Sequence, residues 1–255
     1  MPSISQSSRE DQDVRVLSYN IHKGIGGYDR RYRLQRVIDV IQAEEPDLIC
    51  LQEVDRHVKR SRFDDQPAIL AEYFIAKSMN YQLNVSIAGG GYGNLVLSRW
   101  PMHTATHVNL RLGRRKPRGA QVLVVDSPHG NFHLINWHLG LGERERRWQV
   151  EQLLQHEHFE AGSCLPTLIV GDFNDWRNKL AEHIFHRHGF EQITNPTRKF
   201  RSFPAYWPVM ALDKAFRRGS LEVRGATVVR SSLTRKASDH LPLRLDLELT
   251  GNSLT

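Results

Sequence analysis

"YRLQRVIDVIQAEEPDLICLQEV", residues 32–54, joins a helical pattern to a buried strand. Its first half repeats apolar residues at the spacing of one helix face, and Pro46 stops the helix because a proline disfavours helical backbone in the residue before it. The apolar run that follows is typical of a buried strand and ends at Glu53. Residues 14–20, VRVLSYN, form another such run, which ends at Asn20. Together these segments predict a βαβ unit, whose strands lie near each other with their carboxyl ends on one side.

The rest of the chain predicts more strands than helices. Short apolar runs predict strands at 81–87, 93–98, 103–110, 121–126, 131–137, 167–171, 211–216, 221–229 and 243–249. Helical patterns cover about 67–79, 143–159 and 178–188. Many connections are short and hairpin-like, so part of the sheet structure must be antiparallel or mixed. We therefore expect one α/β domain over residues 14–249, with two mixed β-sheets packed face to face and helices outside, between polar tails at 1–13 and 250–255.

Length and composition limit the class of protein. A chain of 255 residues with 40% hydrophobic residues can bury a substantial core, and no stretch reaches the roughly 18 apolar residues of a membrane span. Residues 1–13 lack the basic-then-apolar order of a signal peptide, which favours a cytoplasmic protein. The two cysteines form no CxxC or Cys/His cluster, so a structural zinc site is not expected.

The chain is basic, with a formal net charge of +7. Such a charge suits a polyanionic partner: nucleic acid, an anionic membrane surface or a phosphorylated substrate. The basic residues cluster in predicted connections, at Arg30, Arg31 and Arg33, in the segment 111–119 (RLGRRKPRG), and at Arg217 and Arg218. These clusters either meet a ligand or are simply solvated loop charges.

Polar residues of a few types close six separate apolar runs. They are Asn20, Glu53, His138, Asp172, Asn174, Asp213, Asp239 and His240. A single one means little, because polar residues end most strands and Asn or Asp favours turns. The whole set is harder to explain by turns and helix caps alone. Carboxylate and amide oxygens together with two histidines are the groups that metal-assisted hydrolysis uses.

Three members of this set carry oxygen ligands for a metal ion: Glu53, Asp239 and Asn20. Mg²⁺ prefers one or two carboxylates together with water and substrate phosphate oxygens, rather than a closed protein cage. Zinc would need more His or Cys ligands than these residues offer. The sequence therefore predicts a Mg²⁺ site, with Mn²⁺ as the substitute ion.

Seven motifs occur in the order typical of one enzyme superfamily. They are YNIHKG (19–24), LQEVD (51–55), YGNLVLSRWP (92–101), NWHLGL (136–141), GDFNDW (171–176), LDKAF (212–216) and SDHLPL (238–243). Over residues 14–248 the chain resembles the endonuclease/exonuclease/phosphatase superfamily of DNase I-like enzymes, most closely its bacterial YbhP-type branch. The superfamily includes nucleases, sphingomyelinases, deadenylases and inositol-polyphosphate phosphatases. The resemblance implies a four-layer α/β/β/α sandwich and a metal-dependent phosphodiesterase.

The resemblance also implies roles around the metal and the attacking water. Glu53 would be the principal Mg²⁺ ligand with Asn20 beside it, and Asp239 would support the metal or the water. Asp172 would orient and deprotonate the water. Asn174 would hold a phosphate oxygen or that same water.

The remaining residues would act on the substrate. His240 would contact the scissile phosphate and share proton transfer, as an alternative base to the aspartate, with Asp213 fixing its tautomer. His138 would neutralise phosphoryl charge or protonate the leaving group. Arg118 aligns with a segment that meets substrate phosphate in the resembling branch. We interpret the Gly-rich stretch 88–94 as a flexible approach to the site, from which Asn94 reaches the substrate.

Three functions fit these features. A Mg²⁺-dependent nuclease acting on DNA or RNA is favoured by the basic loops and by aromatic residues available to stack on bases. A phosphodiesterase or phosphatase for a phospholipid or small phosphorylated metabolite would use the same core, and the apolar loop WPVM (207–210) would then meet a membrane surface. A non-catalytic nucleic-acid-binding protein would have lost part of the site, whereas every expected catalytic position is filled. We expect a monomer.

Overall fold

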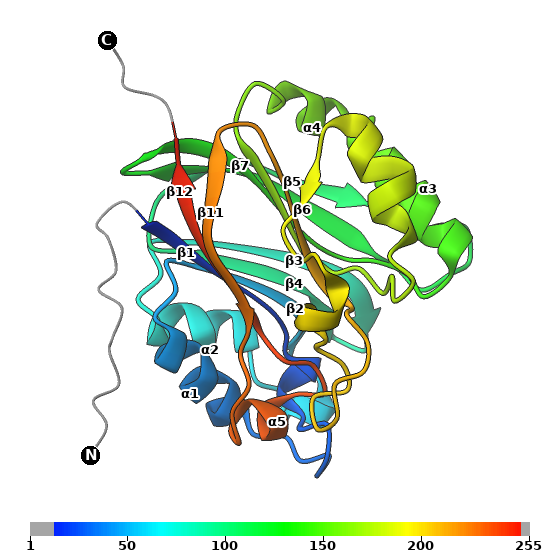
Figure 1. The fold of residues 1–255 in the computed structure, drawn as a ribbon. Helices are drawn as coiled ribbons and strands as arrows, with labels where there is room; N and C mark the ends of the chain where they lie inside the picture. Colours follow the sequence, from blue (N-terminus) through cyan, green and yellow to red (C-terminus); the bar gives the residue numbers. More distant parts are fainter. Residues whose placement is uncertain (1–12, 251–255) are drawn as a thin grey trace.

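Two six-stranded β-sheets pack face to face in the computed structural model, which describes residues 13–250 except for the side chain of Thr104 (Figure 1). The first sheet has the strand order β11-β12-β1-β2-β4-β3, and the second has the order β5-β6-β7-β8-β10-β9. The first contains β1 (Asp13–Asn20), β2 (Leu48–Arg56), β3 (Ser78–Ile87), β4 (Gly90–Ser98), β11 (Leu221–Val228) and β12 (Leu243–Leu249). The second contains β5 (Met102–Asn109), β6 (Gly119–Ser127), β7 (Gly130–His138), β8 (Thr167–Asp172), β9 (Glu191–Gln192) and β10 (Asp213–Arg218). Both sheets are mixed, because β1–β2 and β7–β8 are parallel pairs whereas the other pairs are antiparallel.

Helices cover the outer face of each sheet and complete four layers (Figure 1). Near the first sheet lie α1 (Leu34–Glu44), α2 (Gln66–Tyr73) and α5 (Thr234–Ala237), and near the second lie α3 (Glu143–Leu154) and α4 (Glu157–Ala161). Shorter helical turns occur at 22–24, 59–61, 181–185, 186–188 and 197–200. The predicted fold class, two mixed sheets packed face to face with helices outside, is confirmed.

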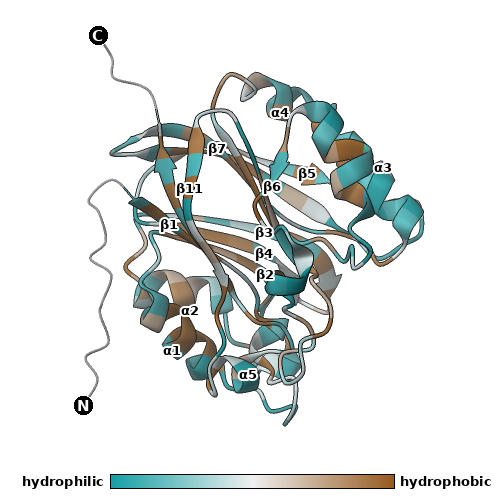
Figure 2. Cartoon of the chain, in the orientation of Figure 1, coloured by the Kyte–Doolittle hydropathy of each residue, from teal (hydrophilic) through white to brown (hydrophobic). Residues whose placement is uncertain are grey.

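Three apolar clusters hold the layers together. The central cluster joins the two sheets and includes Val16, Leu48, Val96, Leu134 and Leu168, all of them buried. The outer clusters pack α1 on the first sheet and α3 on the second. Figure 2 shows the apolar residues along the central strands and the hydrophilic residues on α5 and on much of α3. Burial of a single leucine or isoleucine contributes about 1.5–3 kcal/mol, so the sandwich is held mainly by its core.

A row of amides crosses between the two sheets from the middle of β2 to β7, β6 and β3. The side-chain amide of Gln52 donates to Asn136 Oδ1 over 2.8 Å, and the amide of Asn136 donates to Gln121 Oε1 over 2.8 Å. Gln121 in turn donates to the side chain of Asn80 over 2.6 Å. Because a buried amide without a partner is costly, this chain of bonds fixes how the two sheets sit against each other.

The helix predictions are wrong in three places. The helix expected at about 67–79 ends at Tyr73, because the backbone of residues 77 and 78 is already committed to pairing with β4. The helix expected at 143–159 is interrupted between α3 and α4, where the side chain of His156 accepts a hydrogen bond from the backbone of His158. The helix expected at 178–188 begins only after Asn178, whose φ of 58° lies outside the helical region.

The Gly-rich stretch 88–94 is not the flexible approach that the sequence suggested, because it turns the β3–β4 hairpin and forms the first half of β4. Glycine is required there for close approach. A Cβ on Gly93 would lie 1.7 Å from the carbonyl oxygen of Gln82, and one on Gly91 would lie 2.1 Å from that of Val85. Both contacts lie at a register shift between β3 and β4, and a strand that bends this tightly has no room for side chains.

The expectation of a single domain over residues 14–249 stays a prediction. Asp13 already belongs to β1, and β12 ends at Leu249. The tails predicted at 1–13 and 250–255 otherwise fall almost entirely outside the described residues. Within residues 13–250, no helix combines the length and apolar character needed to cross a membrane.

Candidate active site

Polar residues from both sheets come together at one end of the sandwich, and the strand register explains how. His138 of β7 pairs with Asp172 of β8 in the parallel ladder, and Asp213 of β10 pairs with Asp172 on the other side. The three side chains therefore lie in a row across the second sheet. Asn20 ends β1 in the first sheet, and its amide nitrogen donates to Asp172 Oδ2 over 3.0 Å. The site thus spans the contact between the sheets.

Asp172 is the point on which the other groups converge. Its Oδ2 atom is 3.0 Å from Asn20 Nδ2, 3.3 Å from His138 Nε2 and 3.7 Å from His240 Nε2. Its Oδ1 atom accepts a hydrogen bond from the backbone of Asn174 over 3.0 Å. Burial raises the pKa of Asp172 to about 6, against the opposing charge of His240. A carboxylate with this pKa is suited to take up a proton near neutral pH.

His240 is oriented by a buried carboxylate. Its Nδ1 atom is 2.8 Å from Asp213 Oδ2, and the same oxygen accepts a hydrogen bond from the hydroxyl of Ser202. Burial alone would lower the pKa of His240, but the charges of Asp213 and Asp172 outweigh it and raise this pKa to about 10. His240 is therefore a cation at neutral pH, with its Nε2 directed to the side where Asp172 lies.

The stretch GDFND at 171–175 divides into a site residue and a structural one. Asn174 has a φ of 52°, which folds the chain back so that its side-chain amide donates to the carbonyl of Leu139 over 3.0 Å. Asp175 points the other way, where its carboxylate accepts from the backbone of Leu180 over 2.8 Å and lies 3.8 Å from the guanidinium of Arg146. Asp175 therefore serves to shape the turn, whereas Asn174 remains beside Asp172.

Glu53 enters the site from a bulge in β2. Its φ of 58° is unusual for a residue with a side chain, and the pairing of β2 with β4 shifts register between Leu51 and Val54. Such bulges redirect side chains and often lie next to active sites. The carboxylate of Glu53 contacts the ammonium group of Lys23 and lies 3.9 Å from His138 Nδ1. Burial opposes ionisation of Glu53, but the charge of Lys23 holds the pKa of this carboxyl well below its usual range.

Arg118 is buried close to the row formed by His138, Asp172 and Asp213. Only 7% of the residue is exposed, and its Nε atom has no hydrogen-bond partner among the described residues. Burial lowers the pKa of His138 well below its usual value, and the charge of Arg118 lowers it further, so His138 is neutral at neutral pH. The same charge favours the ionised form of Asp172. A buried guanidinium with a free donor in this position is suited to an anionic ligand.

Two of the predicted site residues lie apart from this row. Asn94 is buried within β4, where its amide donates to the carbonyl of Gly119 over 3.0 Å, next in the chain to Arg118. Asp239 is partly exposed at the rim, and its Oδ1 atom is 3.7 Å from His22 Nδ1. Asn94 thus holds the segment that carries Arg118, and Asp239 neighbours the site through His240.

The predicted metal ligands are Glu53, Asn20 and Asp239. Within residues 13–250, no group of three or more His, Cys, Asp or Glu side chains is arranged to hold a metal ion. Glu53 already attracts one cation, the ammonium group of Lys23. Asn20 pairs with Gln52, the residue before Glu53, in the parallel ladder of β1 and β2, so these two predicted metal ligands come from neighbouring strands.

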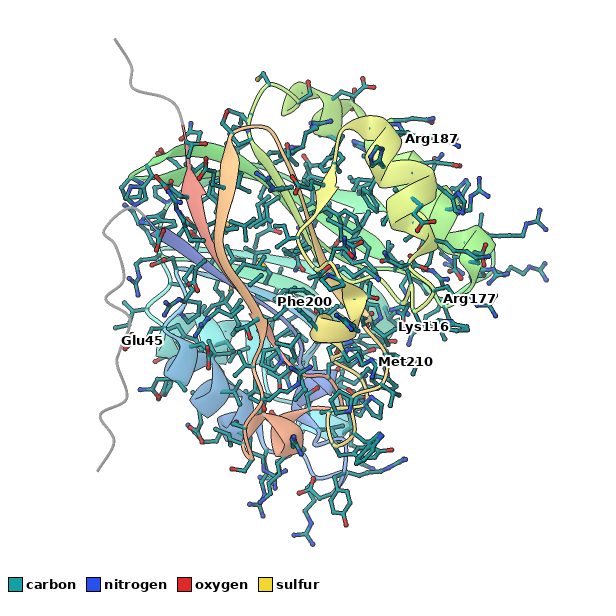
Figure 3. The ribbon with its side chains drawn as sticks, in the orientation of Figure 1. Glu45, Lys116, Arg177, Arg187, Phe200 and Met210 are labelled. Atoms are coloured by element: carbon teal, nitrogen blue, oxygen red, sulfur yellow. The ribbon has the colours of Figure 1, made fainter. Side chains whose placement is uncertain are left out.

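Sequence reasoning missed several residues around the site. Lys23 follows the YNIH stretch and pairs with Glu53, whereas Ser202 lies in an irregular loop and bonds to Asp213. Lys116 belongs to the basic segment 111–119, but no pattern in the sequence predicted that it would lie close to Tyr92. Figure 3 shows Lys116 on the side of the molecule far from Glu45, which follows α1.

The sequence and the fold place the chain in a family of hydrolytic enzymes. Residues 17–240 match the family described as Endonuclease/Exonuclease/phosphatase family, and the chain belongs to it. The predicted membership in this superfamily is therefore confirmed. Among curated proteins, YbhP of Escherichia coli (strain K12), described as uncharacterized, is 29% identical over 245 residues, which cover 92% of this chain and 96% of YbhP.

Solved structures share the fold at lower sequence identity. An endonuclease/exonuclease/phosphatase from Beutenbergia cavernae has a TM-score of 0.76 at 22% identity, covering 96% of this chain and 73% of that one. The catalytic domain of human Nocturnin, solved with a bound sulfate anion, has a TM-score of 0.70 at 19% identity and covers 95% and 96% of the two chains. A mannosyl-6-phosphatase of Bacteroides thetaiotaomicron has a TM-score of 0.68 at 18% identity and covers 92% and 99%.

Proposed function

We propose that this protein is a Mg²⁺-dependent hydrolase of phosphodiester bonds, and that it acts as a nuclease on DNA or RNA. The observation that carries this proposal is the convergence of Asn20, His138 and His240 on one carboxylate oxygen of Asp172. A water molecule held by that oxygen would attack the phosphate, and Asn20, His138 and His240 would be close enough to donate hydrogen bonds to the phosphate oxygens. Family membership supports the hydrolytic chemistry.

Glu53 and Asn20 would hold the metal, with Asp239 as a supporting group at the rim. When bound, Mg²⁺ supplies positive charge to the phosphate oxygens and to the developing negative charge of the reaction. The chain itself provides the remaining charge through Arg118, which is buried with a free donor. Preorganised charges of this kind are usually the largest contribution to such catalysis.

Proton transfer follows from the ionisation states of the buried groups. Asp172, with its raised pKa, would accept the proton of the attacking water. The bond from phosphorus to the leaving oxygen breaks as the water attacks, and that oxygen takes up a proton from the solvent. His240 stays protonated through Asp213 and donates a hydrogen bond to the phosphate, so we assign the base role to Asp172 rather than to His240. Neutral His138 would orient the water or the phosphate. The backbone N–H of Asn174 holds the carboxylate of Asp172 in place by donating to its Oδ1 atom.

A groove beside the site supports nucleic acid as the substrate. It has a volume of about 530 Å³ and is lined by Tyr28, Tyr206, Arg230, Ser231, Ser232, Arg235 and Lys236. Tyr28 is 79% exposed and Tyr206 is 54% exposed. The backbone of Ala205, the residue before Tyr206, donates to the carbonyl of Asp239, the residue before His240, which links the loop of Tyr206 to the site. Exposed aromatic rings with basic side chains are the features that bind single strands through stacking and charge.

One exposed apolar loop favours a second candidate, hydrolysis of a phospholipid or a small phosphorylated metabolite. Trp207 is 72% exposed and Val209 is 47% exposed, both in the loop that precedes Asp213. Such side chains can enter a membrane surface. A mannosyl-6-phosphatase shares this fold.

The decisive experiment first tests for phosphodiester hydrolysis and then identifies the substrate. Hydrolysis of bis-p-nitrophenyl phosphate with Mg²⁺ and with EDTA tests for catalysis, and a panel of plasmid DNA, single-stranded DNA, RNA and phospholipid vesicles then identifies the substrate. We expect Mg²⁺-dependent hydrolysis that falls at least about a hundredfold in Asp172→Ala, Glu53→Ala and His240→Ala. A folded protein without any hydrolysis would favour the non-catalytic alternative, and cleavage of vesicle lipids alone would favour the second candidate.

A further inference from the structure

Three basic side chains surround the ring of Tyr92, and we call this group the basic ring cluster. Lys23 Nζ lies 5.3 Å from the ring centroid, Arg60 Cζ lies 5.0 Å from it, and Lys116 Nζ lies 5.2 Å from it. Tyr92 itself is buried in β4, with 6% exposed. The three cations come from separate connections: the turn at 22–24, the turn at 59–61 and the segment before β6. Folding alone therefore gathers them.

The positive charge of the basic ring cluster is only partly neutralised. Arg60 forms two hydrogen bonds to Asp55, over 2.9 and 2.7 Å, and Lys23 contacts Glu53. The ammonium group of Lys116 has no carboxylate partner in the described part of the chain. Glu53 is also the proposed metal ligand. A metal ion bound to Glu53 would neutralise this carboxylate, so the positive charge of Lys23 would no longer be balanced by it. Attraction to one aromatic ring does not require three cations, so the cluster is best suited to an external anion.

The basic ring cluster lies directly beside the candidate active site. Lys23 contacts Glu53, and the other oxygen of Glu53 is 3.9 Å from His138. The charge of Lys116, like that of Arg118, acts on His138. Arg118, His138, Asp172 and His240 remain available for the phosphate that reacts. The basic ring cluster offers a separate position, because the carboxylate of Glu53 lies between Lys23 and His138.

We propose that the basic ring cluster binds a second phosphate of the substrate, next to the phosphate that is hydrolysed. This assignment rests on the proposed function. The substrate class is then a phosphodiester that carries a further phosphate, either a terminal phosphate or the next internucleotide linkage. Arg60 is suited to hold two phosphate oxygens in a fixed direction because Asp55 orients its guanidinium, while Lys23 and Lys116 adjust around them.

Short thymidine oligonucleotides test the proposal with purified protein and Mg²⁺. The dinucleotide TpT is compared with pTpT, which carries a 5′ phosphate, with TpTp, which carries a 3′ phosphate, and with the trinucleotide TpTpT. We expect at least one phosphorylated dinucleotide to have a kcat/KM at least about tenfold above that of TpT, mainly through a lower KM. If TpTpT shares the gain, the second phosphate is an internucleotide one; if it does not, the phosphate is terminal. Equal kcat/KM values for all four substrates would overturn the proposal.

Two matched variants assign the effect to the cluster. Lys116→Gln removes one exposed cation of the cluster and should abolish most of the preference, whereas Arg114→Gln removes an exposed cation of the same loop that lies outside the cluster and should preserve it. The same loss in both variants would contradict a specific subsite.

A binding measurement separates this proposal from the proposed function. If no oligonucleotide is hydrolysed, titration calorimetry of metal-free protein with pTpT, TpTp and TpT in EDTA decides the matter. A tighter complex with a phosphorylated dinucleotide, lost in Lys116→Gln and kept in Arg114→Gln, would support the second-phosphate site even though nuclease activity had failed. Equal affinities, or no binding at all, would reject the site.

Discussion

The carboxylate of Asp213 accepts a hydrogen bond from Nδ1 of His240 over 2.8 Å, and both side chains are buried. The two residues come from different segments, β10 and the loop after α5, and they meet beside Asp172. This arrangement keeps His240 positively charged and turns its other nitrogen toward the reacting groups. The proposed division of roles, with Asp172 as base and His240 as cation, depends on this one bond.

The variant Asp213→Asn tests whether the negative charge of Asp213, and not only its size, is needed to keep His240 protonated. The amide has nearly the same size but no negative charge, so His240 should lose its proton at neutral pH. We expect kcat for bis-p-nitrophenyl phosphate to fall at least about a hundredfold with little change in KM. Asp126→Asn is a matched control, because Asp126 also faces a histidine, His103 at 3.7 Å, but on an exposed part of the surface. Similar activity in the two variants would remove Asp213 from the mechanism.

The rate of hydrolysis should depend on pH in a direction that the buried groups set. Asp172 must be ionised to accept a proton, so kcat should fall as the pH drops through about 6, where this carboxyl becomes protonated. His240 must keep its proton, so kcat should fall again as the pH rises through about 10. Asp213→Asn should move the alkaline limb to lower pH, because His240 loses the charge that raises its pKa. A profile that stays flat down to pH 5 in a folded enzyme would contradict the role of Asp172.

Much of this site was predictable from the sequence, because its polar residues follow apolar runs that mark the ends of strands. The apolar runs locate the strand ends, and parallel neighbours place Asn20 and Glu53 at one edge and His138 and Asp172 at another. The register itself was not predictable. Asp213 lies beside Asp172 only because β10 pairs antiparallel with β8, and no local pattern in the sequence encodes this partner.

The residues that sequence reasoning missed depend on irregular backbone and on contacts between distant segments. Lys23 reaches Glu53 from a turn in which Lys23 itself has a φ of 64°. Ser202 lies in a loop without periodic pattern. The amide bonds from Gln52 to Asn136 cross between the sheets, and a buried glutamine in a strand gives no sign of its partner. Periodicity predicts elements and faces, but tertiary packing decides these contacts.

Metal binding should respond in opposite directions to two substitutions at Glu53 and Lys23. Glu53→Gln removes the proposed ligand and should abolish Mg²⁺ binding in titration calorimetry. Lys23→Gln removes the ammonium group that contacts this carboxylate, so Mg²⁺ affinity in the absence of substrate should rise at least about threefold. Lys59→Gln, an exposed lysine in a neighbouring turn, should leave the affinity unchanged. Unaltered Mg²⁺ affinity in Glu53→Gln would place the metal elsewhere, and Mn²⁺ should follow the same order.

The groove of Tyr28 and Tyr206 should contribute charge and stacking separately to single-stranded DNA binding. Affinity for a short oligonucleotide in EDTA should fall as salt rises, and Arg235→Gln and Lys236→Gln should each reduce the salt slope by about 1 if each side chain contacts a phosphate. Tyr206→Ala should weaken binding by about 1–3 kcal/mol without changing that slope, because stacking releases no counterions. Arg187→Gln, on an exposed surface near α3 (Figure 3), is the control and should leave both quantities unchanged. If the salt slope is the same in Arg235→Gln and Lys236→Gln as in the unmodified protein, the groove does not carry the nucleic acid.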